Sequence, residues 1–482
     1  MIVTKCRARV VRDNSGVATE IPTLVADSGP LETVTKYVLH MHLRGNANST
    51  IEQHIASIAK FIEYIDANSD ISHAPSEVFS SFVERLSSGT IDENGNDPSG
   101  LYWNTTPAST VSKTISHITD FTDYIFFLTG NNPVNPQITA SSYDKKIQYA
   151  AYVRKKEGDF LAHTKTFSSN ATARQTRLIR GKVQRSNPEQ EAKRFPEKLF
   201  NEFLIHGLAT AKDPRIGLRD MLICLLMHGA GLRVSEALGL WVTDVFEDKS
   251  QSSSVIVRIY DEVNGAAPNN WKSKNGLTSR KQYLKERYSQ KPREEHMGTS
   301  HIGEKIARWD NTQEMYCHVH FFPSSFGELF KELWFQYLPY RAAVEDVSPY
   351  AFINFNGKTR GKGLNYRTFV DSYERALARI SMSQDKDEGR SPHGHRHAYG
   401  QRLKNAGVDP LSIQRLMHHA SIESQQTYTV TSFKDMSAAL SNAELESDNQ
   451  ISINDLLSTQ YFSDVDPLGL LSGQTRLKRM KK

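Results

Sequence analysis

Cysteine is scarce in this chain of 482 residues, and long apolar runs are missing. The three cysteines, Cys6, Cys224 and Cys317, lie far apart and form no Cys-x-x-Cys pair, so we expect no disulfide framework and a reducing cytosol. No stretch approaches the roughly 18 consecutive apolar residues of a membrane helix. Residues 1–16 also lack the apolar core of a signal peptide. We therefore expect a soluble, cytoplasmic protein with no membrane partner.

The most informative motif lies near the C-terminus. It spaces His393, Arg396, His419 and Tyr428 as phosphoryl transfer to a tyrosine requires. A phosphodiester attacked by a phenol passes through a phosphorane with charge on its non-bridging oxygens, so the protein must supply fixed cations, a proton shuttle and the nucleophile. Arginine suits the cation role because its planar, permanently charged fork reaches two phosphate oxygens.

A second arginine, Arg233, follows an apolar run that Gly229 and Gly231 interrupt. With both arginines in view, the chain resembles the tyrosine recombinases, the phage-integrase-like family. The resemblance is carried by GAGLRVSEALGL, then by His-x-x-Arg-His, and then by a His that is followed nine residues later by Tyr. It assigns catalytic roles to Arg233, His393, Arg396, His419 and Tyr428.

The resemblance also assigns two supporting residues. Glu236 matches the acidic position that braces the first arginine, and His397 follows the second arginine as it does in the family. The family's usual Leu-Gly-His is replaced here by Met417-His418-His419. The spacing to the tyrosine favours His419 over His418 as the phosphate-contacting histidine.

The family's remaining catalytic group is a lysine on a β-hairpin between the first arginine and the His-x-x-Arg block. Residues 254–260, SVIVRIY, are short and β-branched and predict a strand. The next segment has two lysines before Asn275-Gly276, a dipeptide common in hairpin turns. Lys274 is the preferred candidate and Lys272 the reserve. Residues 286–316 are polar with few apolar anchors, which predicts an insertion or extended loop.

A metal site is the competing reading of the histidine-rich block. His393, His395 and His397 alternate, but Arg396 would lie beside the ion and repel it, and no third ligand has a typical spacing. Residues 317–320, CHVH, read more simply as a strand. We expect no metal and no other cofactor, because a covalent phosphotyrosyl bond retains the energy of the broken phosphodiester.

The net charge of +5 is modest but unevenly spread. Residues 144–194 contain 13 Lys/Arg and 5 Asp/Glu, an excess larger than that of the whole chain. Alone, such a stretch is as often a solvated face or linker; beside a phosphodiester-cleaving site it reads better as a contact to the DNA backbone. The candidate DNA-binding residues in it are Arg154, Lys155, Lys156, Arg174, Arg177, Arg180, Lys182 and Arg185.

Helical patterns dominate the first half of the chain. Isoleucines recur on one face of residues 51–65, and Ser49 with Glu52 forms a capping-box signature before them. A second helix is predicted over residues 111–128, ended by Gly130 and Pro133. Such stripes alone indicate only a core, but their position resembles the core-binding domain of tyrosine recombinases.

We expect a mixed α+β fold that is mainly α. The predicted parts are a small N-terminal β element (1–30), a helical, SAM-like core-binding domain (31–180) with a basic linker to about residue 195, a tyrosine recombinase catalytic domain with a small antiparallel sheet (196–440), and a C-terminal segment with a basic tail (441–482). The last part is acidic and partly apolar between residues 435 and 475. Packing on its own domain and exchange onto a neighbouring protomer both remain open for it.

By resemblance, the protein is a site-specific DNA recombinase, an integrase or transposase of a mobile element. Tyr428 would attack a phosphate and leave a 3′-phosphotyrosyl bond, while Lys274 would protonate the departing 5′-oxygen. The implied partners are double-stranded DNA, three further copies in a homotetramer on synapsed DNA (monomer or dimer otherwise), and other recombination proteins of the element. The implied location is the bacterial nucleoid. The runs SPHGHRHAYGQRL and HHASIESQQTYT further resemble the recombinases of gamma-mobile-trio elements.

Two alternatives stay open. A topoisomerase or telomere resolvase shares this active site and differs only in its DNA products. A catalytically silent, sequence-specific DNA-binding regulator is the other, and against it every catalytic position holds a competent residue type.

Overall fold

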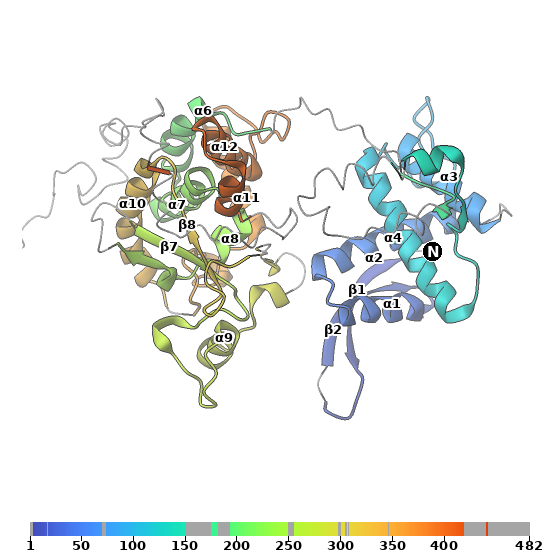
Figure 1. The fold of residues 1–482 in the computed structure, drawn as a ribbon, viewed down its shortest axis with the longest axis horizontal. Coiled ribbons are helices and arrows are strands. Elements are labelled where there is room, and N and C mark those ends of the chain that lie inside the picture. The colour runs from blue at the N-terminus through green and yellow to red at the C-terminus, as the bar shows by residue number, and fades with distance from the viewer. Residues whose placement is uncertain are drawn as a thin grey trace, which may run out of the picture. The chain divides into compact units, whose positions relative to one another are not determined.

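The computed structural model shows two compact units, residues 1–190 (the N-terminal unit) and 191–482 (the C-terminal unit). Each is described by itself (Figure 1). None of the helices in the described ranges is long and apolar enough to span a bilayer. The structure describes residues 3–16, 18–69, 74–147, 149, 175–181, 193–248, 255–296, 300–303, 306, 308–345, 347–418 and 440–441.

The N-terminal unit packs helices against an antiparallel sheet of order β1-β2-β3, and β4 pairs with β5 in a second, two-stranded sheet. Ile21 and Leu24 of β2 are buried in the same core as the helices. The predicted N-terminal β element is therefore built into the helical unit. The elements are β1 (Thr4–Val11), β2 (Ala18–Ala26), β3 (Gly29–Pro30), α1 (Glu32–Leu43), α2 (Asn48–Ala67), α3 (Pro75–Ser88), α4 (Ala108–Thr129), β4 (Gln137–Thr139) and β5 (Gln175–Arg177).

Helix α4 confirms the helix predicted over residues 111–128, and Gly130 ends it in the left-handed conformation that favours glycine. The predicted capping box before α2 is wrong. The helix begins at Asn48 with Ala47 as N-cap, and Glu52 instead pairs with Lys5 of β1. Ser49 therefore lies inside the first turn and does not occupy the N-cap position.

The C-terminal unit is built around α7, whose residues from Gly217 to Ala230 are all buried. Helices α10 and α12 pack on it, and the antiparallel sheet has the order β6-β7-β8 (Figure 1). The expected class, mixed α+β and mainly α, is confirmed. The elements are α6 (Glu197–Glu202), α7 (Pro214–Ala230), α8 (Val234–Gly239), β6 (Val245–Glu247), β7 (Val255–Tyr260), α9 (Arg280–Tyr288), β8 (Tyr316–Val319), α10 (Ser324–Ala342), α11 (Tyr366–Arg379), α12 (Pro392–Asn405) and α13 (Pro410–Leu416).

A buried arginine helps to anchor the polar stretch 286–316 in the C-terminal unit. Arg293 donates hydrogen bonds to the carbonyl oxygens of Leu238 (3.0 Å) and Leu364 (2.5 Å). Its backbone N–H donates to Glu262, 2.6 Å away, which also accepts from Tyr350. Much of this stretch is irregular, but at Arg293 it is anchored in the core.

Candidate active site

The turn that follows α7 fixes the orientation of Arg233. Gly231 has a φ of +70°, and a Cβ there would lie 2.3 Å from the Tyr399 ring, so both conformation and space require glycine. Arg233 follows as the extended N-cap of α8, and its backbone N–H donates to Glu236 at 2.8 Å. The Gly-x-Gly-Leu-Arg segment therefore works as a turn that aims the arginine.

Glu236 brings the two predicted arginines together. Its Oε1 lies 2.5 Å from Nη1 of Arg233 and its Oε2 lies 3.6 Å from Nη1 of Arg396. The side chains of Glu236 and Arg396 are 0% and 1% exposed, whereas that of Arg233 is 19% exposed. The buried carboxylate of Glu236 thus balances the charges of Arg233 and Arg396. Of these two arginines, Arg233 is the one whose side chain is partly exposed to solvent.

Arg396 is held on α12, where Ser391 caps the first turn. It donates to the carbonyl oxygens of Gly231 (2.6 Å) and Met417. Burial, with the nearby Arg233 charge, lowers the pKa of Arg396 to about 10, while Glu236 opposes the shift. The guanidinium remains charged at neutral pH.

The alternating histidines of α12 point to different surroundings. His393 is exposed and packs against His397, with ring centroids 4.4 Å apart. Burial and the charge of Arg396 lower the pKa of His397. His395 turns inward, where it lies within hydrogen-bonding distance of His228 (3.2 Å) and of the Tyr373 hydroxyl (2.9 Å).

A buried polar network therefore lies under α12, and sequence reasoning did not find it. Arg402 donates to Glu197 (2.6 Å) and to Nε2 of His228 (2.9 Å), and His228 reaches His395. Burial lowers the pKa of His228 to about 4. Across the part of the chain that the structure describes, no three His, Cys, Asp or Glu side chains are arranged to hold a metal.

His418, which the spacing argument passed over, lies beside the arginine pair. Its carbonyl oxygen accepts from Nη1 of Arg233 at 3.4 Å, and its Nε2 lies 3.4 Å from the carbonyl oxygen of His318 on β8. Burial lowers the pKa of His418, while Glu236 opposes the shift. The side chain of His318 lies 3.7 Å from Asp310. His419 and Tyr428 lie outside the described residues.

The segment with the two candidate lysines folds back on itself as expected: Ala266 and Ser279 form an antiparallel bridge, and the N–H of Ala267 donates to the carbonyl oxygen of Thr278 at 2.7 Å. Strand β7 confirms residues 255–260 of the strand predicted over 254–260, while residue 254 lies outside the described residues; its partner is β8, with Tyr260 opposite Tyr316. The predicted local turn is present: the N–H of Gly276 donates to the carbonyl oxygen of Ser273 at 3.0 Å. Lys272 and Lys274 are exposed in this turn-rich segment. Among the contacts of the described residues, none joins either lysine to Arg233, Glu236 or Arg396.

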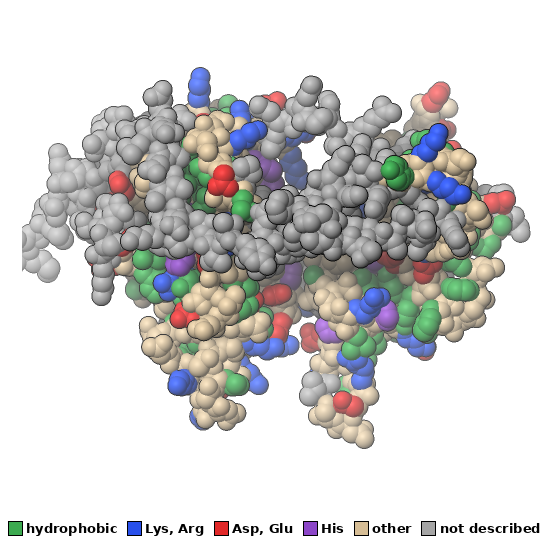
Figure 2. All heavy atoms as spheres, in the orientation of Figure 1, with side chains coloured by type: hydrophobic (Ala, Val, Ile, Leu, Met, Phe, Trp, Pro, Cys, Tyr) green, Lys and Arg blue, Asp and Glu red, His purple; other side chains and the backbone are tan. Residues whose placement is uncertain are grey.

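Two of the candidate DNA-binding residues are described, and both are ion-paired within the N-terminal unit. Arg177 pairs with Asp123 and also donates to the carbonyl oxygen of Asn135 at 2.9 Å, and Arg180 pairs with Asp144. On the face drawn in Figure 2, Lys/Arg and Asp/Glu side chains are interspersed over the described surface. The other candidates, Arg154, Lys155, Lys156, Arg174, Lys182 and Arg185, lie outside the described residues.

Comparisons with known proteins find a family model and several curated proteins to which part of this chain is similar. Residues 204–435 match the model of the phage integrase family. Tyrosine recombinase XerA of Pyrococcus horikoshii is 26% identical over 228 residues, which are 47% of this chain and 56% of that protein. Tyrosine recombinase XerC of Myxococcus xanthus is 25% identical over 231 residues, 47% of this chain and 55% of that protein. The chain spans about half the length of these curated relatives.

A solved structure gives a looser likeness. It is the structure of the XerH site-specific recombinase bound to palindromic difH substrate, a post-cleavage complex. The match has 13% sequence identity and a TM-score of 0.43, and it covers 77% of this chain and 73% of that chain.

Proposed function

We propose, from the premise that residues 204–435 form a phage integrase family domain, that the chain is a tyrosine-type site-specific DNA recombinase. The observation that carries the proposal is the buried Glu236 between Arg233 and Arg396. Fixed cations held by a desolvated carboxylate are suited to an anion whose charge grows during reaction, because they need not reorganise when that charge appears.

The two arginines divide the work. Within the described part of the chain, the hydrogen bonds of the Arg233 side chain use only Nη1, so its Nε and Nη2 groups remain for phosphate oxygens. Arg396 donates to two backbone carbonyls, and a guanidinium has five N–H donors, so donors remain there too. Arg233 and Arg396 can therefore donate hydrogen bonds to two non-bridging phosphate oxygens, while Glu236 fixes the orientation of their guanidinium groups.

The remaining roles follow from the chemistry. Tyr428 Oη attacks the phosphorus, the 5′-oxygen leaves, and a 3′-phosphotyrosyl bond stores the energy for rejoining. His393, exposed at the first turn of α12, takes the phenolic proton and later returns it, and His419 donates to a non-bridging oxygen. Lys274 supplies the proton of the leaving 5′-hydroxyl.

The substrate in this proposal is double-stranded DNA, bound by a homotetramer when two sites are synapsed. The finer assignment is to an integrase or transposase of a mobile element, of the kind found in gamma-mobile-trio elements. The support for that subgroup is the sequence runs around Arg396 and Tyr428.

The test of the proposal is covalency at Tyr428. Tyr428→Phe should bind DNA from the junction of the element that carries the gene, yet form no adduct on a nicked suicide substrate. Tyr366→Phe, at an exposed tyrosine of α11, is the matched control and should form adduct like the parent protein. An adduct formed by the Tyr428→Phe protein on a denaturing gel would remove Tyr428 from its role. Loss of activity in EDTA with rescue by a metal ion would revive a metal site.

A second test separates the two lysines. Lys274→Ala should cleave native DNA slowly and recover on a substrate with a 5′-bridging phosphorothiolate, because sulfur leaves without a proton. Lys272→Ala should show little of this pattern. The reverse result would move the role to Lys272, and equal defects without recovery would exclude both lysines.

A further inference from the structure

A pocket of about 480 Å³ opens between β6, β7 and the segment that follows β7. Its lining combines aromatic rings (Phe246, Tyr260, Trp271), side-chain amides (Asn269, Asn270, Gln313) and cationic groups (Arg258, Lys272). The volume lies in the range of small-molecule sites. This mixture of flat apolar walls, amide groups and cations suits a ligand that has both a planar ring and an anionic group.

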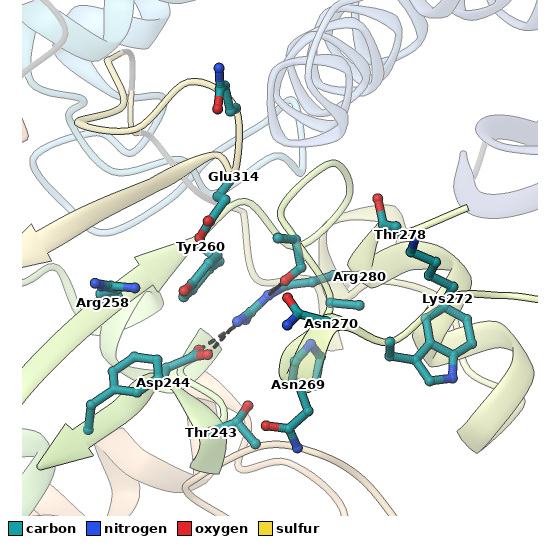
Figure 3. A pocket seen from close by; sticks show the side chains of 16 residues that line it. Thr243, Asp244, Arg258, Tyr260, Asn269, Asn270, Lys272, Thr278, Arg280 and Glu314 are labelled. Carbon is teal, nitrogen blue, oxygen red and sulfur yellow. Dashed lines mark hydrogen bonds and ion pairs between the residues drawn. The ribbon is translucent and has the colours of Figure 1, made fainter. Parts of the chain in front are cut away.

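Arg258 is set rigidly at this pocket. Its guanidinium lies 5.0 Å from the ring centre of Phe246 and 4.4 Å from that of Tyr316, so rings from two other strands fix its plane. Its Nε is buried and has no hydrogen-bond partner among the described residues. Figure 3 shows Arg258 and Tyr260 on one side of the pocket, with Asn269, Asn270 and Lys272 on the other.

The opposite wall is held in an uncommon backbone conformation. Asn269 and Asn270 have φ values of 55° and 54°, in the left-handed region that asparagine tolerates better than most residues. The remaining charged pair of the lining, Arg280 with Asp244, is buried and satisfied, as the dashed lines of Figure 3 show. With Glu314 counted, the lining keeps one net positive charge, from Arg258 and Lys272.

The pocket adjoins the candidate active site across a single strand. Arg258 of β7 lies opposite His318 of β8 in the antiparallel register, so the two side chains share a face of the sheet. The carbonyl oxygen of His318 is 3.4 Å from the His418 ring, and His418 touches Arg233. The pocket is therefore linked to the arginine pair through β8 and His418.

We propose that this pocket binds one nucleotide of the DNA, turned out of the duplex beside the cleavage point. Arg258 and Lys272 take its phosphate, and Trp271 with the amides of Asn269 and Asn270 receives its base. An aromatic wall accepts any base by stacking, while amides and Glu314 select among base edges. This inference rests on the proposed recombinase function and adds a determinant of where on the DNA cleavage occurs.

The test uses duplexes of one sequence in three forms: fully paired, with one extra 2-aminopurine on one strand, and with an abasic residue at that place. The full-length protein should bind the 2-aminopurine duplex about tenfold more tightly than the paired one, and the abasic form should lose this preference. The 2-aminopurine fluorescence should change on binding, because the base leaves its neighbours for the pocket.

Two variants test whether this pocket causes the preference for the duplex with the extra 2-aminopurine. Arg258→Gln and Asn269→Gly should both abolish it; the glycine variant also relieves the left-handed backbone, so loss of folding would not explain its result. Arg287→Gln, at an exposed arginine of α9 outside the lining, removes the same charge and should keep the preference.

Equal binding of the three duplexes, or a preference that survives in both pocket variants, would overturn the proposal. Arg258-dependent binding of free 2-aminopurine deoxynucleoside monophosphate, without any preference among the duplexes, would overturn DNA as the source of the nucleotide. If the paired duplex still forms the Tyr428 adduct in these cases, the recombinase proposal stands and only the pocket assignment fails.

Discussion

The two units bury charge very differently. Among the described residues of the N-terminal unit, the buried acidic or basic side chains other than histidine are Asp97 and Asp144, and the core is apolar and aromatic. The C-terminal unit buries Arg219, Asp220, Glu236, Asp244, Glu262, Arg280, Arg293, Arg341, Arg396 and Arg402. Desolvating a charge is costly unless it is paired or hydrogen-bonded, so such a core needs a functional or geometric reason.

The kind of partner explains the contrast. Asp97 accepts from the backbone N–H groups of Ser99 (2.9 Å) and Tyr102 (2.6 Å), which shapes a local loop. Arg396 and Glu236 instead join α8, α12 and the end of α7. Apolar packing dominates the core of the N-terminal unit, where the buried Asp144 pairs with the partly exposed Arg180. In the C-terminal unit, Glu236 and Arg396 are both fully buried and join segments that carry the candidate site.

The largest effect is expected when the central carboxylate is removed. Glu236→Gln keeps the shape but leaves two adjacent arginines without a counter-charge, and removing one partner of a buried pair costs about 3–5 kcal/mol. We expect that loss in urea unfolding of the C-terminal unit, together with at least a hundredfold slower adduct formation. The matched control is Glu374→Gln, at an exposed glutamate of α11 in the same unit, which should change neither. Normal stability in the Glu236 variant would show that the arginines do not depend on it.

An intermediate effect is expected when the pH is lowered, which should reduce the free energy of unfolding of both units. His54 of the N-terminal unit and His228 of the C-terminal unit each have a pKa lowered by burial from 6.5 to about 4. Between pH 6.5 and pH 4 these histidines are protonated in the unfolded chain but neutral in the folded chain. The free energy of unfolding is therefore highest above pH 6.5 and falls as the pH drops toward 4. Each histidine should cost about 2 kcal/mol between pH 7 and pH 5.

Hydrogen exchange of α2 and α7 amides, corrected for intrinsic rates, measures this loss in each unit separately. His54→Asn keeps a polar group near the Tyr37 hydroxyl, which lies 2.9 Å from Nδ1, but cannot titrate. The variant should weaken the pH dependence of the stability measured at α2 amides and leave that measured at α7 amides unchanged. Identical profiles in parent and variant would assign the pH dependence to other groups, with His117 as the neighbouring candidate.

The smallest effect is expected at a partly exposed ion pair. Asp123→Asn breaks the pair with Arg177, whose side chains are 36% and 28% exposed, and such pairs contribute about 1 kcal/mol or less. The N-terminal unit should therefore unfold at nearly the same urea concentration. Arg177, which keeps its hydrogen bond to the carbonyl oxygen of Asn135, should raise DNA affinity slightly if it faces the DNA backbone, and fluorescence anisotropy at low salt would detect this. A loss of several kcal/mol would mean that this unit also depends on charge pairs.

Local signals allowed correct predictions where one segment decides its own conformation. Gly130 ends α4, and the β-branched run at residues 255–260 forms β7, because these outcomes depend on backbone freedom and side-chain alternation. The capping box at Ser49 and Glu52 failed because the helix begins at Asn48 with Ala47 as its N-cap, so Ser49 lies inside the first turn. The partner of β7 could not be read locally either, since β8 lies more than fifty residues further along the chain.

The sequence by itself determined the chemical types at the candidate site, since the order and spacing of Arg233, Glu236, His393 and Arg396 resemble a family motif and lie within the residues that match the phage integrase family model. Only the tertiary structure decided that Glu236 touches both arginines, that His418 lies against Arg233, and that His395 turns away into a buried network. Motif spacing records which residues occur, whereas contacts between them depend on how α7, α8, α12 and β8 pack, and packing is a property of the whole core.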